Sequence, residues 1–222
     1  MNQKNKNISI NISFPLPEEK IFRSGSVPKI LELLINNPHQ EFSISQLEKI
    51  TNKGTSGIHR GIDILRALDL IKKRKEGKKL LISINRERVD KPDDPIFAIP
   101  QDNFRDPIRK VKQEIIDNID YVAGVLVFGS VARGEADRAS DIDLLILVED
   151  NLTSARRKTS ELVSKLQNQE INGERYEFEV LVESDESAKK RGDNLRNIFS
   201  EGIVLHNSKT LEKLKEEIFD GK

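Results

Sequence analysis

The sequence contains no cysteine and no tryptophan, and its three histidines are far apart in the chain. Without cysteine there are no disulfides and no thiolate metal ligands, and the scattered histidines argue against a histidine-based zinc site. The apolar runs are much shorter than the roughly 20 residues that span a membrane. The N-terminus also lacks the apolar segment of a secretory signal. We therefore expect a cytoplasmic protein that does not associate with membranes.

The composition, 36% hydrophobic and 33% charged residues, is that of a globular protein. The formal net charge is zero, but the two parts of the chain differ in sign. Residues 1–98 contain 18 Lys/Arg and 12 Asp/Glu, whereas residues 99–222 contain 19 and 25. This asymmetry predicts two domains, 1–98 and 99–222, with different partners.

The basic part begins with a pattern of three short helices. Ser26 is placed to cap the first helix, and Ser45 and Glu48 have the spacing of a capping box in the second. The third helix is predicted over residues 55–70 from the spacing of its apolar residues. The segment IKKRKEGKKLLISIN that follows is predicted to form a basic β-hairpin.

Three short helices followed by a basic hairpin resemble the winged helix-turn-helix family, over residues 27–85. The resemblance implies that the third helix enters the major groove of DNA and that the hairpin, the wing, contacts phosphates. The DNA-binding residues would be Ser56, His59 and Arg60 on the helix and Lys72, Lys73, Arg74, Lys75, Lys78 and Lys79 on the wing. The alternative is a solvated, lysine-rich hairpin on a protein–protein module.

Residues 85–107 are rich in Pro and Asp and have no periodicity, so they are predicted to be a linker. A helix is expected from Pro107 to about Ile119. Its apolar stripe would consist of Ile108, Val111, Ile115 and Ile119.

The stretch VLVFGSVARGEADRASDIDLLILVED, residues 125–150, contains two apolar strands around a polar loop. Gly129 allows the backbone to turn sharply and to approach a ligand closely. A short helix after Ser130 would direct N–H groups at a phosphate, and the Ser130 hydroxyl would bind a phosphate oxygen. Arg133 would either hold the loop or offset phosphate charge.

Two aspartates occupy the start of the second apolar strand. Alternation places Asp141 and Asp143 on one face, ~6.6 Å apart along the strand, with Ile142 on the other. Two carboxylates directed at one point repel each other, and a shared cation relieves the repulsion. Hard oxygen ligands that face phosphates favour Mg²⁺, with Mn²⁺ as a substitute.

A third carboxylate is expected from the segment ERYEFEVLVES, in which Glu177 and Glu179 share one face. Such a group could accept the proton of an attacking hydroxyl or share the metal. We favour Glu179, which is closer to the apolar part of the strand, and keep Glu177 as the alternative. Both could also lie on the solvated side of an edge strand.

Gly129-Ser130, Arg133-Gly134 and Ser140-Asp141-Ile142-Asp143-Leu144 resemble the signature of the polymerase-beta-type nucleotidyltransferase superfamily, and the similarity spans residues 107–205. The resemblance implies an α+β/α/β fold in which a short mixed sheet packs on helices. It also implies transfer of a nucleoside monophosphate from an NTP with release of pyrophosphate. The nucleotide-binding residues would be Gly129, Ser130, Arg133, Gly134 and Ser140, and the catalytic, metal-binding residues Asp141, Asp143 and Glu179.

The resulting hypothesis is a metal-dependent nucleotidyltransferase with a DNA-binding winged helix. ATP is the first choice of nucleotide, the acceptor is a protein, an RNA or a small molecule, and a homodimer is considered. The alternative is an NTP-sensing, DNA-binding transcriptional regulator, or an antitoxin-like partner-binding protein, with little turnover.

Overall fold

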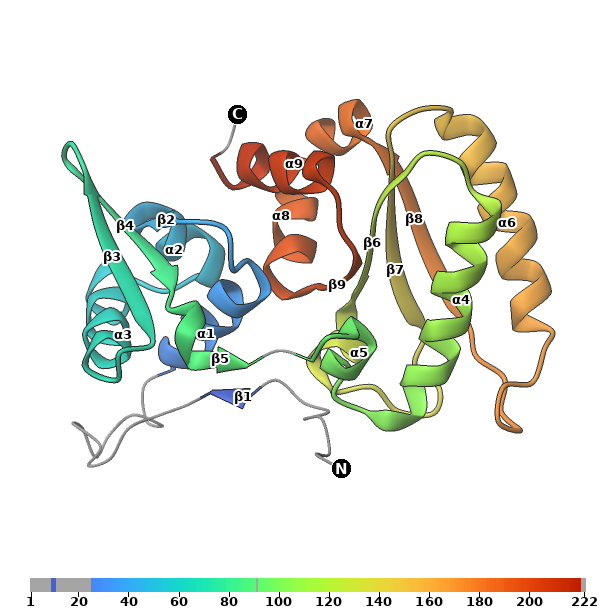
Figure 1. The fold of residues 1–222 in the computed structure, drawn as a ribbon, viewed down its shortest axis with the longest axis horizontal. Coiled ribbons are helices and arrows are strands. Elements are labelled where there is room, and N and C mark those ends of the chain that lie inside the picture. Colours follow the sequence, from blue (N-terminus) through green and yellow to red (C-terminus); the bar gives the residue numbers. More distant parts are fainter. Residues whose placement is uncertain (1–8, 11–24, 91, 221–222) are drawn as a thin grey trace. The chain divides into compact units, whose positions relative to one another are not determined.

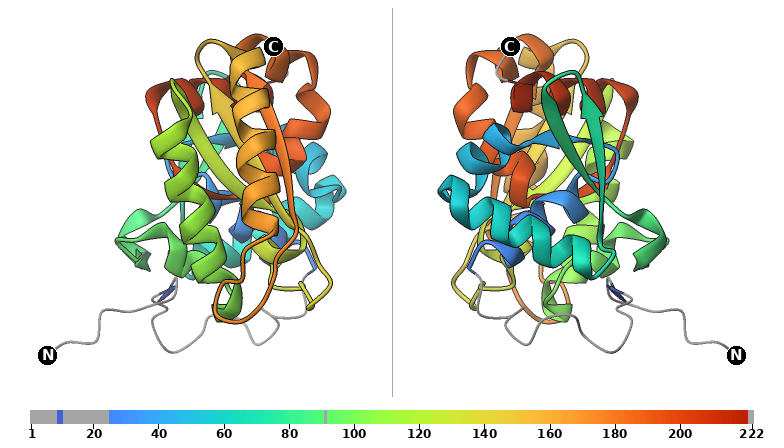
Figure 2. Two further views of the ribbon diagram at one scale, coloured as in Figure 1. Left: turned by 90° about the vertical axis from the view of Figure 1, so that its right-hand side faces the viewer. Right: turned by 90° about the vertical axis from the view of Figure 1, so that its left-hand side faces the viewer.

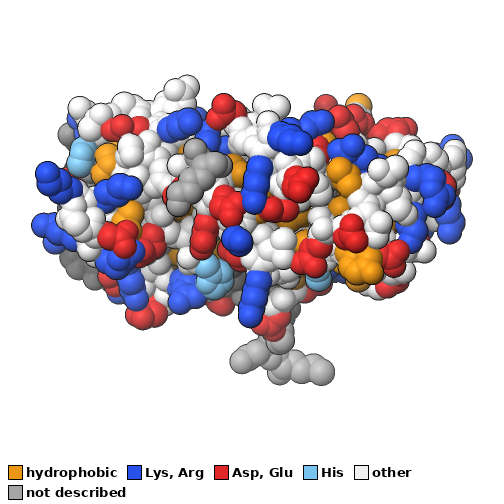
Figure 3. Space-filling model, turned by 90° about the horizontal axis from the view of Figure 1, so that it is seen from above, with side chains coloured by type: hydrophobic (Ala, Val, Ile, Leu, Met, Phe, Trp, Pro, Cys, Tyr) orange, Lys and Arg blue, Asp and Glu red, His pale blue; other side chains and the backbone are white. Residues whose placement is uncertain are grey.

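The computed structural model describes residues 9–10, 25–90 and 92–220. The chain forms two compact units, Met1–Lys91 and Pro92–Lys222 (Figure 1). Charged side chains of both signs are interspersed over the face drawn in Figure 3. No helix in these described ranges is long and apolar enough to span a membrane.

The first unit consists of three helices and a small antiparallel sheet. Its elements are α1 (Val27–Asn36), β2 (Phe42–Ser43), α2 (Ile44–Thr51), α3 (Thr55–Ala67), β3 (Ile71–Glu76) and β4 (Lys79–Ile84). The strand order is β2-β4-β3, so the predicted hairpin β3-β4 lies beside a short strand that precedes α2. A separate two-stranded pair joins β1 (Ser9–Ile10) to β5 (Val89–Asp90).

The structure bears out the N-cap position predicted for α1 but not a capping hydrogen bond there, and it corrects the capping box predicted for α2. Ser26 occupies the N-cap position of α1, but its backbone is already helical and its hydroxyl donates instead to the Gly57 carbonyl of α3, at 2.7 Å. The capping box of α2 is formed by Ser43 and Gln46. The reason is that α2 begins directly after β2, where Ser43 has the extended backbone that an N-cap requires.

The second unit is a four-stranded mixed sheet with helices on both faces. Its elements are η3 (Pro95–Ala98), η4 (Asp102–Phe104), α4 (Arg105–Asn118), β6 (Val122–Phe128), α5 (Gly129–Arg133), β7 (Ile142–Val148), α6 (Leu152–Gln167), β8 (Phe178–Ser184), α7 (Asp185–Lys190), α8 (Gly192–Glu201), β9 (Ile203–His206) and α9 (Lys209–Asp220). The strand order is β8-β7-β6-β9. Strands β7 and β8 are parallel, because α6 carries the chain back between them, and the pairs β6-β7 and β6-β9 are antiparallel.

Helices α4 and α6 cover one face of this sheet, and α7, α8 and α9 lie on the other (Figures 1 and 2). The predicted stripe of α4 is confirmed, since all four of its apolar residues are buried: Ile108, Val111, Ile115 and Ile119. They pack against the inward-facing residues of β6 and β7. The fourth strand, β9, was not predicted.

The segment predicted as a linker belongs largely to the core of the second unit, which corrects that prediction. Ile96, Ile99 and Phe104 are buried in its hydrophobic cluster. The buried Arg105 guanidinium donates two hydrogen bonds to the Ile99 carbonyl, at 3.0 and 2.8 Å. Proline and aspartate hide this role from a periodicity argument, because two short 3₁₀ helices have no sustained apolar repeat.

Candidate active site

The two aspartates and the preferred glutamate lie at the same end of three neighbouring strands. In the pairing register, Asp143 of β7 is opposite Phe128 at the end of β6 and opposite Glu179 near the start of β8. Asp141 directly precedes β7 and is exposed, whereas Asp143 is partly buried. The structure therefore brings together residues that are 36 positions apart in the sequence. Glu177 lies outside β8, and its carbonyl accepts a hydrogen bond from Ile142.

Gly129 lies directly against the carboxylate of Asp143. Its φ of +68° is in the left-handed region that favours glycine. A Cβ at this position would be 2.1 Å from Asp143 Oδ2, so any other residue would displace the carboxylate. The glycine predicted to permit close approach of a ligand thus also makes room for an acidic side chain of the site.

The carboxyl group of Asp143 is electrostatically unfavourable when ionised. Burial raises the pKa of Asp143 above its usual range, and the carboxylates of Glu179 and Asp141 act in the same direction. The guanidinium of Arg133 lowers this pKa, and Glu201 raises it. A carboxylate under such repulsion is stabilised by a cation, which is the arrangement expected of a site that works with a bound metal.

Arg133 is held by two carboxylates of the protein. Its Nε donates to Glu135, at 2.8 Å, and its Nη1 donates to both oxygens of Glu201, at 3.0 and 3.1 Å. Of the two roles considered for Arg133, the geometry fits the one of holding the loop, because these bonds connect the end of α5 to the end of α8. Sequence reasoning missed Glu201, which follows no recognisable motif.

The other predicted nucleotide-binding residues lie in α5, at its C-terminal end and in the loop before β7. Ser130 is half-buried in the first turn of α5, and Gly134 ends that helix with a φ of +72°. The Ser140 hydroxyl accepts from the Asp137 N–H at 2.9 Å and donates to the Asp137 carboxylate at 3.0 Å. Ser140 therefore orders the loop that leads into β7.

The donor set at this edge consists of carboxylate oxygens, which suit Mg²⁺ or Mn²⁺. Asp143 and Glu179 are neighbours in register, and Asp141 precedes them. Within the described residues, however, no three His, Cys, Asp or Glu side chains are gathered closely enough to form a metal site. The residue types and the mutual repulsion fit a divalent cation, but the described side chains do not form the predicted three-carboxylate cluster.

The predicted DNA-binding residues are all exposed, but three of the wing cations are engaged with carboxylates. Ser56, His59 and Arg60 lie along α3. On the wing, Lys72 pairs with Glu87, Lys73 with Asp63, and Arg74 with Glu41. In the part of the chain that the structure describes, Lys75, Lys78 and Lys79 have no such pair.

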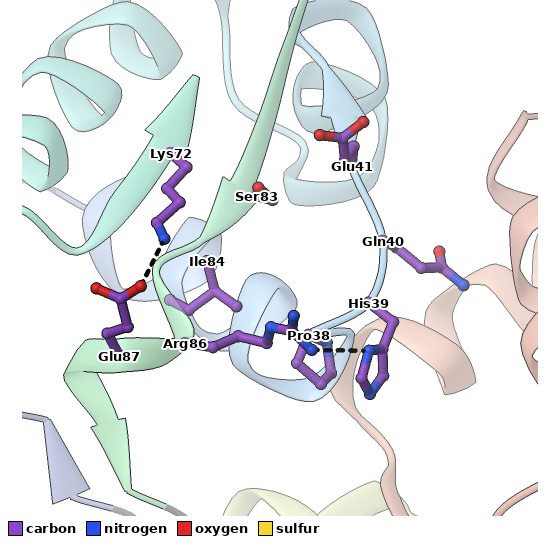
Figure 4. A pocket seen from close by; sticks show the side chains of 9 residues that line it. All are labelled: Pro38, His39, Gln40, Glu41, Lys72, Ser83, Ile84, Arg86 and Glu87. Carbon is purple, nitrogen blue, oxygen red and sulfur yellow. Dashed lines mark hydrogen bonds and ion pairs between the residues drawn. The ribbon is translucent and has the colours of Figure 1, made fainter. Parts of the chain in front are cut away.

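A cavity of about 570 Å³ lies beside the sheet of the first unit. Figure 4 shows two contacts among its lining residues: Lys72 pairs with Glu87, and Arg86 lies beside His39. The Arg86 Nη1 and His39 Nδ1 atoms are 3.2 Å apart. Glu41, also in the lining, is the partner of Arg74.

The model of the nucleotidyltransferase domain family matches residues 108–218, half of the chain, and includes β6, α5, β7 and β8. The chain therefore belongs to this family. The match confirms the nucleotidyltransferase resemblance predicted for the second part of the sequence. No curated protein matches the chain.

Among the solved structures that are similar to this chain are two toxin-antitoxin structures and a candidate nucleotidyltransferase. A toxin-antitoxin with AMP-PNP is 22% identical, with 50% of this chain and 83% of that chain covered and a TM-score of 0.38. A mutant of the toxin-antitoxin MntA-HpeT is 18% identical, with the same coverage and TM-score. A candidate nucleotidyltransferase from Sulfolobus solfataricus is 19% identical, with 47% and 86% covered and a TM-score of 0.31.

Proposed function

We propose that the protein transfers a nucleoside monophosphate from an NTP to a hydroxyl acceptor, with Mg²⁺ or Mn²⁺ and with release of pyrophosphate. One observation carries the proposal. Within a nucleotidyltransferase domain, Asp143 lies between the Gly129 turn and Glu179 of the neighbouring strand. In such an arrangement, a bound cation would neutralise both the carboxylates of the protein and the phosphates of the nucleotide.

Asp141, Asp143 and Glu179 would hold the metal, which when bound supplies charge stabilisation at the reacting phosphoryl group. Glu179 is preferred as the third carboxylate because it is opposite Asp143 in the register, whereas Glu177 lies before β8. Either Glu179 or a neighbouring carboxylate would accept the proton of the acceptor hydroxyl. The protein would thus contribute placement and charge rather than covalent chemistry.

The turn after β6 would hold the triphosphate. Gly129 and Ser130 are at the start of α5, and Gly134 ends it, so the loop is short and closely defined. Arg133 would act as a positioning residue, because its bonds to Glu135 and Glu201 fix the end of α5. ATP remains our first choice of nucleotide.

The test is transfer from each α-labelled NTP with Mg²⁺ or Mn²⁺, with and without cell extract, by the wild type and by the Asp141→Ala/Asp143→Ala double variant. Asp117→Ala is a matched control, because it removes an exposed carboxylate on α4. We expect label on the protein or on one extract component with the wild type and the control only. Equal labelling by the double variant would refute the proposal.

We also propose that the two units are functional domains and that the first is a DNA-binding winged helix. The order α1-β2-α2-α3-β3-β4 and the sheet order β2-β4-β3 support this assignment. The exposed Arg60 on α3 and Lys75 on the wing support contact with phosphates. If metal-dependent NTP binding is found without any transfer, the protein is instead an NTP-sensing regulator or a partner-binding protein.

A further inference from the structure

A groove runs along the free edge of the sheet in the second unit. Strand β8 is the outermost strand of the order β8-β7-β6-β9, and among the described residues it pairs with β7 alone. The groove, of about 430 Å³, is lined by α6, by Val180–Val182 of β8 and by Arg191 between α7 and α8. It has no part in the proposed transfer reaction.

Two arginines from different elements meet here on one buried carboxylate. The side chain of Glu183 is 1% exposed. Arg156 of α6 donates from Nη2 to Glu183 Oε2, at 3.2 Å, and from Nε to the Val182 carbonyl, at 3.1 Å. The Nε of Arg191 lies 2.9 Å from Glu183 Oε1, as an ion pair that lacks hydrogen-bond geometry. Two cations therefore share a single negative charge.

Both guanidinium groups keep donors available. The side chains of Arg156 and Arg191 are 50% and 52% exposed. In the described residues, Nη1 of Arg156 and both Nη atoms of Arg191 have no hydrogen-bond partner. Thr159, which also lines the groove, is 3% exposed, and its hydroxyl has no partner among the described residues. The positive charge in excess, with guanidinium donors left free, points to an anionic ligand.

Protection of a sheet edge explains only part of this arrangement. A charged side chain that covers an edge carbonyl prevents the strand from pairing with another chain, and Arg156 does so at Val182. This role needs neither the second arginine nor the hollow between them. A buried carboxylate that holds two arginine side chains in place beside a groove is instead what a preorganised anion-binding site requires.

We propose that this edge groove binds a phosphate group between Arg156 and Arg191. Two guanidiniums that approach from different elements require an anion with acceptor oxygens on more than one side, which phosphate has. Glu183 is four residues beyond Glu179 on β8, about 13 Å along the strand. The groove is therefore a second site, separate from the proposed triphosphate site at Gly129 and Ser130.

The test is titration of the full chain with inorganic phosphate, without divalent metal and at constant ionic strength, followed by calorimetry. Arg191→Gln is the decisive variant, because Arg156 remains on Glu183 and keeps the buried charge paired. Arg157→Gln is the control, since it removes the same charge from the exposed side of α6, where Arg157 pairs with Glu161. We expect binding at least tenfold weaker in Arg191→Gln and unchanged in the control.

Further arms separate the sources of the phosphate group and the two sites of the protein. A short single-stranded oligoribonucleotide that binds more tightly than inorganic phosphate, with the same dependence on Arg191, identifies a polynucleotide backbone as the ligand. Equal affinities identify free phosphate or a phosphomonoester. The Asp141→Ala/Asp143→Ala variant should bind phosphate like the wild type, whatever its transferase activity. The proposal is overturned by unsaturable binding or by equal affinity of Arg191→Gln and the wild type.

Discussion

At the scale of single residues, the site depends on carboxylates placed where they repel one another. Asp143 is the clearest case, because it is partly buried beside Gly129 and opposite Glu179. Such a group costs folding stability when it is ionised without a cation. Substitutions of these residues are therefore expected to affect folding stability and NTP binding differently.

Asp143→Asn is expected to raise the melting temperature at neutral pH in chelator-treated protein, by roughly 2–4 °C. The pKa of Asp143 is higher in the folded state than in the unfolded chain. The wild type therefore loses folding stability as the pH rises from the unfolded-state pKa through the folded-state pKa. The advantage of the variant should therefore shrink as the pH falls towards 4 and the wild-type carboxyl becomes protonated. Thermal unfolding at several pH values measures this, and metal-dependent NTP binding should be lost.

Gly129→Ala is expected to lose metal-dependent NTP binding with a stability loss of only about 1–2 kcal/mol, the cost of a left-handed non-glycine residue. The new Cβ displaces the flexible end of the Asp143 side chain rather than backbone. Gly173→Ala is the control, because its φ is +82° but nothing lies within 4 Å of its Cβ. Urea unfolding should give similar losses for both variants, and retention of NTP binding by Gly129→Ala would contradict the assigned site.

At the scale of elements, the wing β3-β4 shows that a basic run is not a uniform binding surface. Lys72, Lys73 and Arg74 already have acidic partners, and the hydrogen bond from Arg74 lowers the pKa of Glu41. Exposed pairs of this kind contribute little to stability, but they would reduce the positive charge available in the proposed contact with DNA. Among the described residues, the cations of the wing without such partners lie towards the tip of the hairpin.

Replacing Lys75, Lys78 and Lys79 with Gln should weaken non-specific DNA binding. The slope of the logarithm of the binding constant against the logarithm of salt concentration should fall in magnitude by roughly 1 for each phosphate that is no longer neutralised. The matched change of Lys72 and Lys73 should have a smaller effect per residue, because these lysines are paired. Binding to a DNA duplex at several salt concentrations gives the slope. An unchanged slope in the triple variant would mean that the wing does not contact phosphates.

At the scale of the whole molecule, the boundary between the two units follows the packing of the core and not the change in charge composition. Charge changes sign near residue 98, but η3 already contributes Ile96 to the core of the second unit. Net charge affects partners and solubility and does not determine where a core begins.

A fragment of residues 92–222 is accordingly expected to be more stable than one of residues 99–222, by about 2–4 kcal/mol. The shorter fragment lacks the buried Ile96 and exposes the surface that it covers. Urea unfolding of the two fragments measures the difference. Equal stability would place the segment outside the folded unit.

The sequence by itself determined the local features of this protein. The 3.6-residue repeat of Ile108, Val111 and Ile115 specifies α4, and the apolar runs around Gly129 and Asp143 specify β6 and β7, because these signals depend only on neighbours in the chain. The nucleotidyltransferase signature is local for the same reason. The strand β9 escaped prediction because its three apolar residues, followed by His206, carry no clear period.

Tertiary structure decided which distant groups meet. The parallel register of β7 and β8 sets Glu179 opposite Asp143, and helix packing brings Glu201 to Arg133. Packing also brings Arg156 of α6 and Arg191, which follows α7, to the same carboxylate of Glu183. Such meetings depend on how the sheet and helices pack, and one-dimensional patterns do not record distances between residues far apart in the chain.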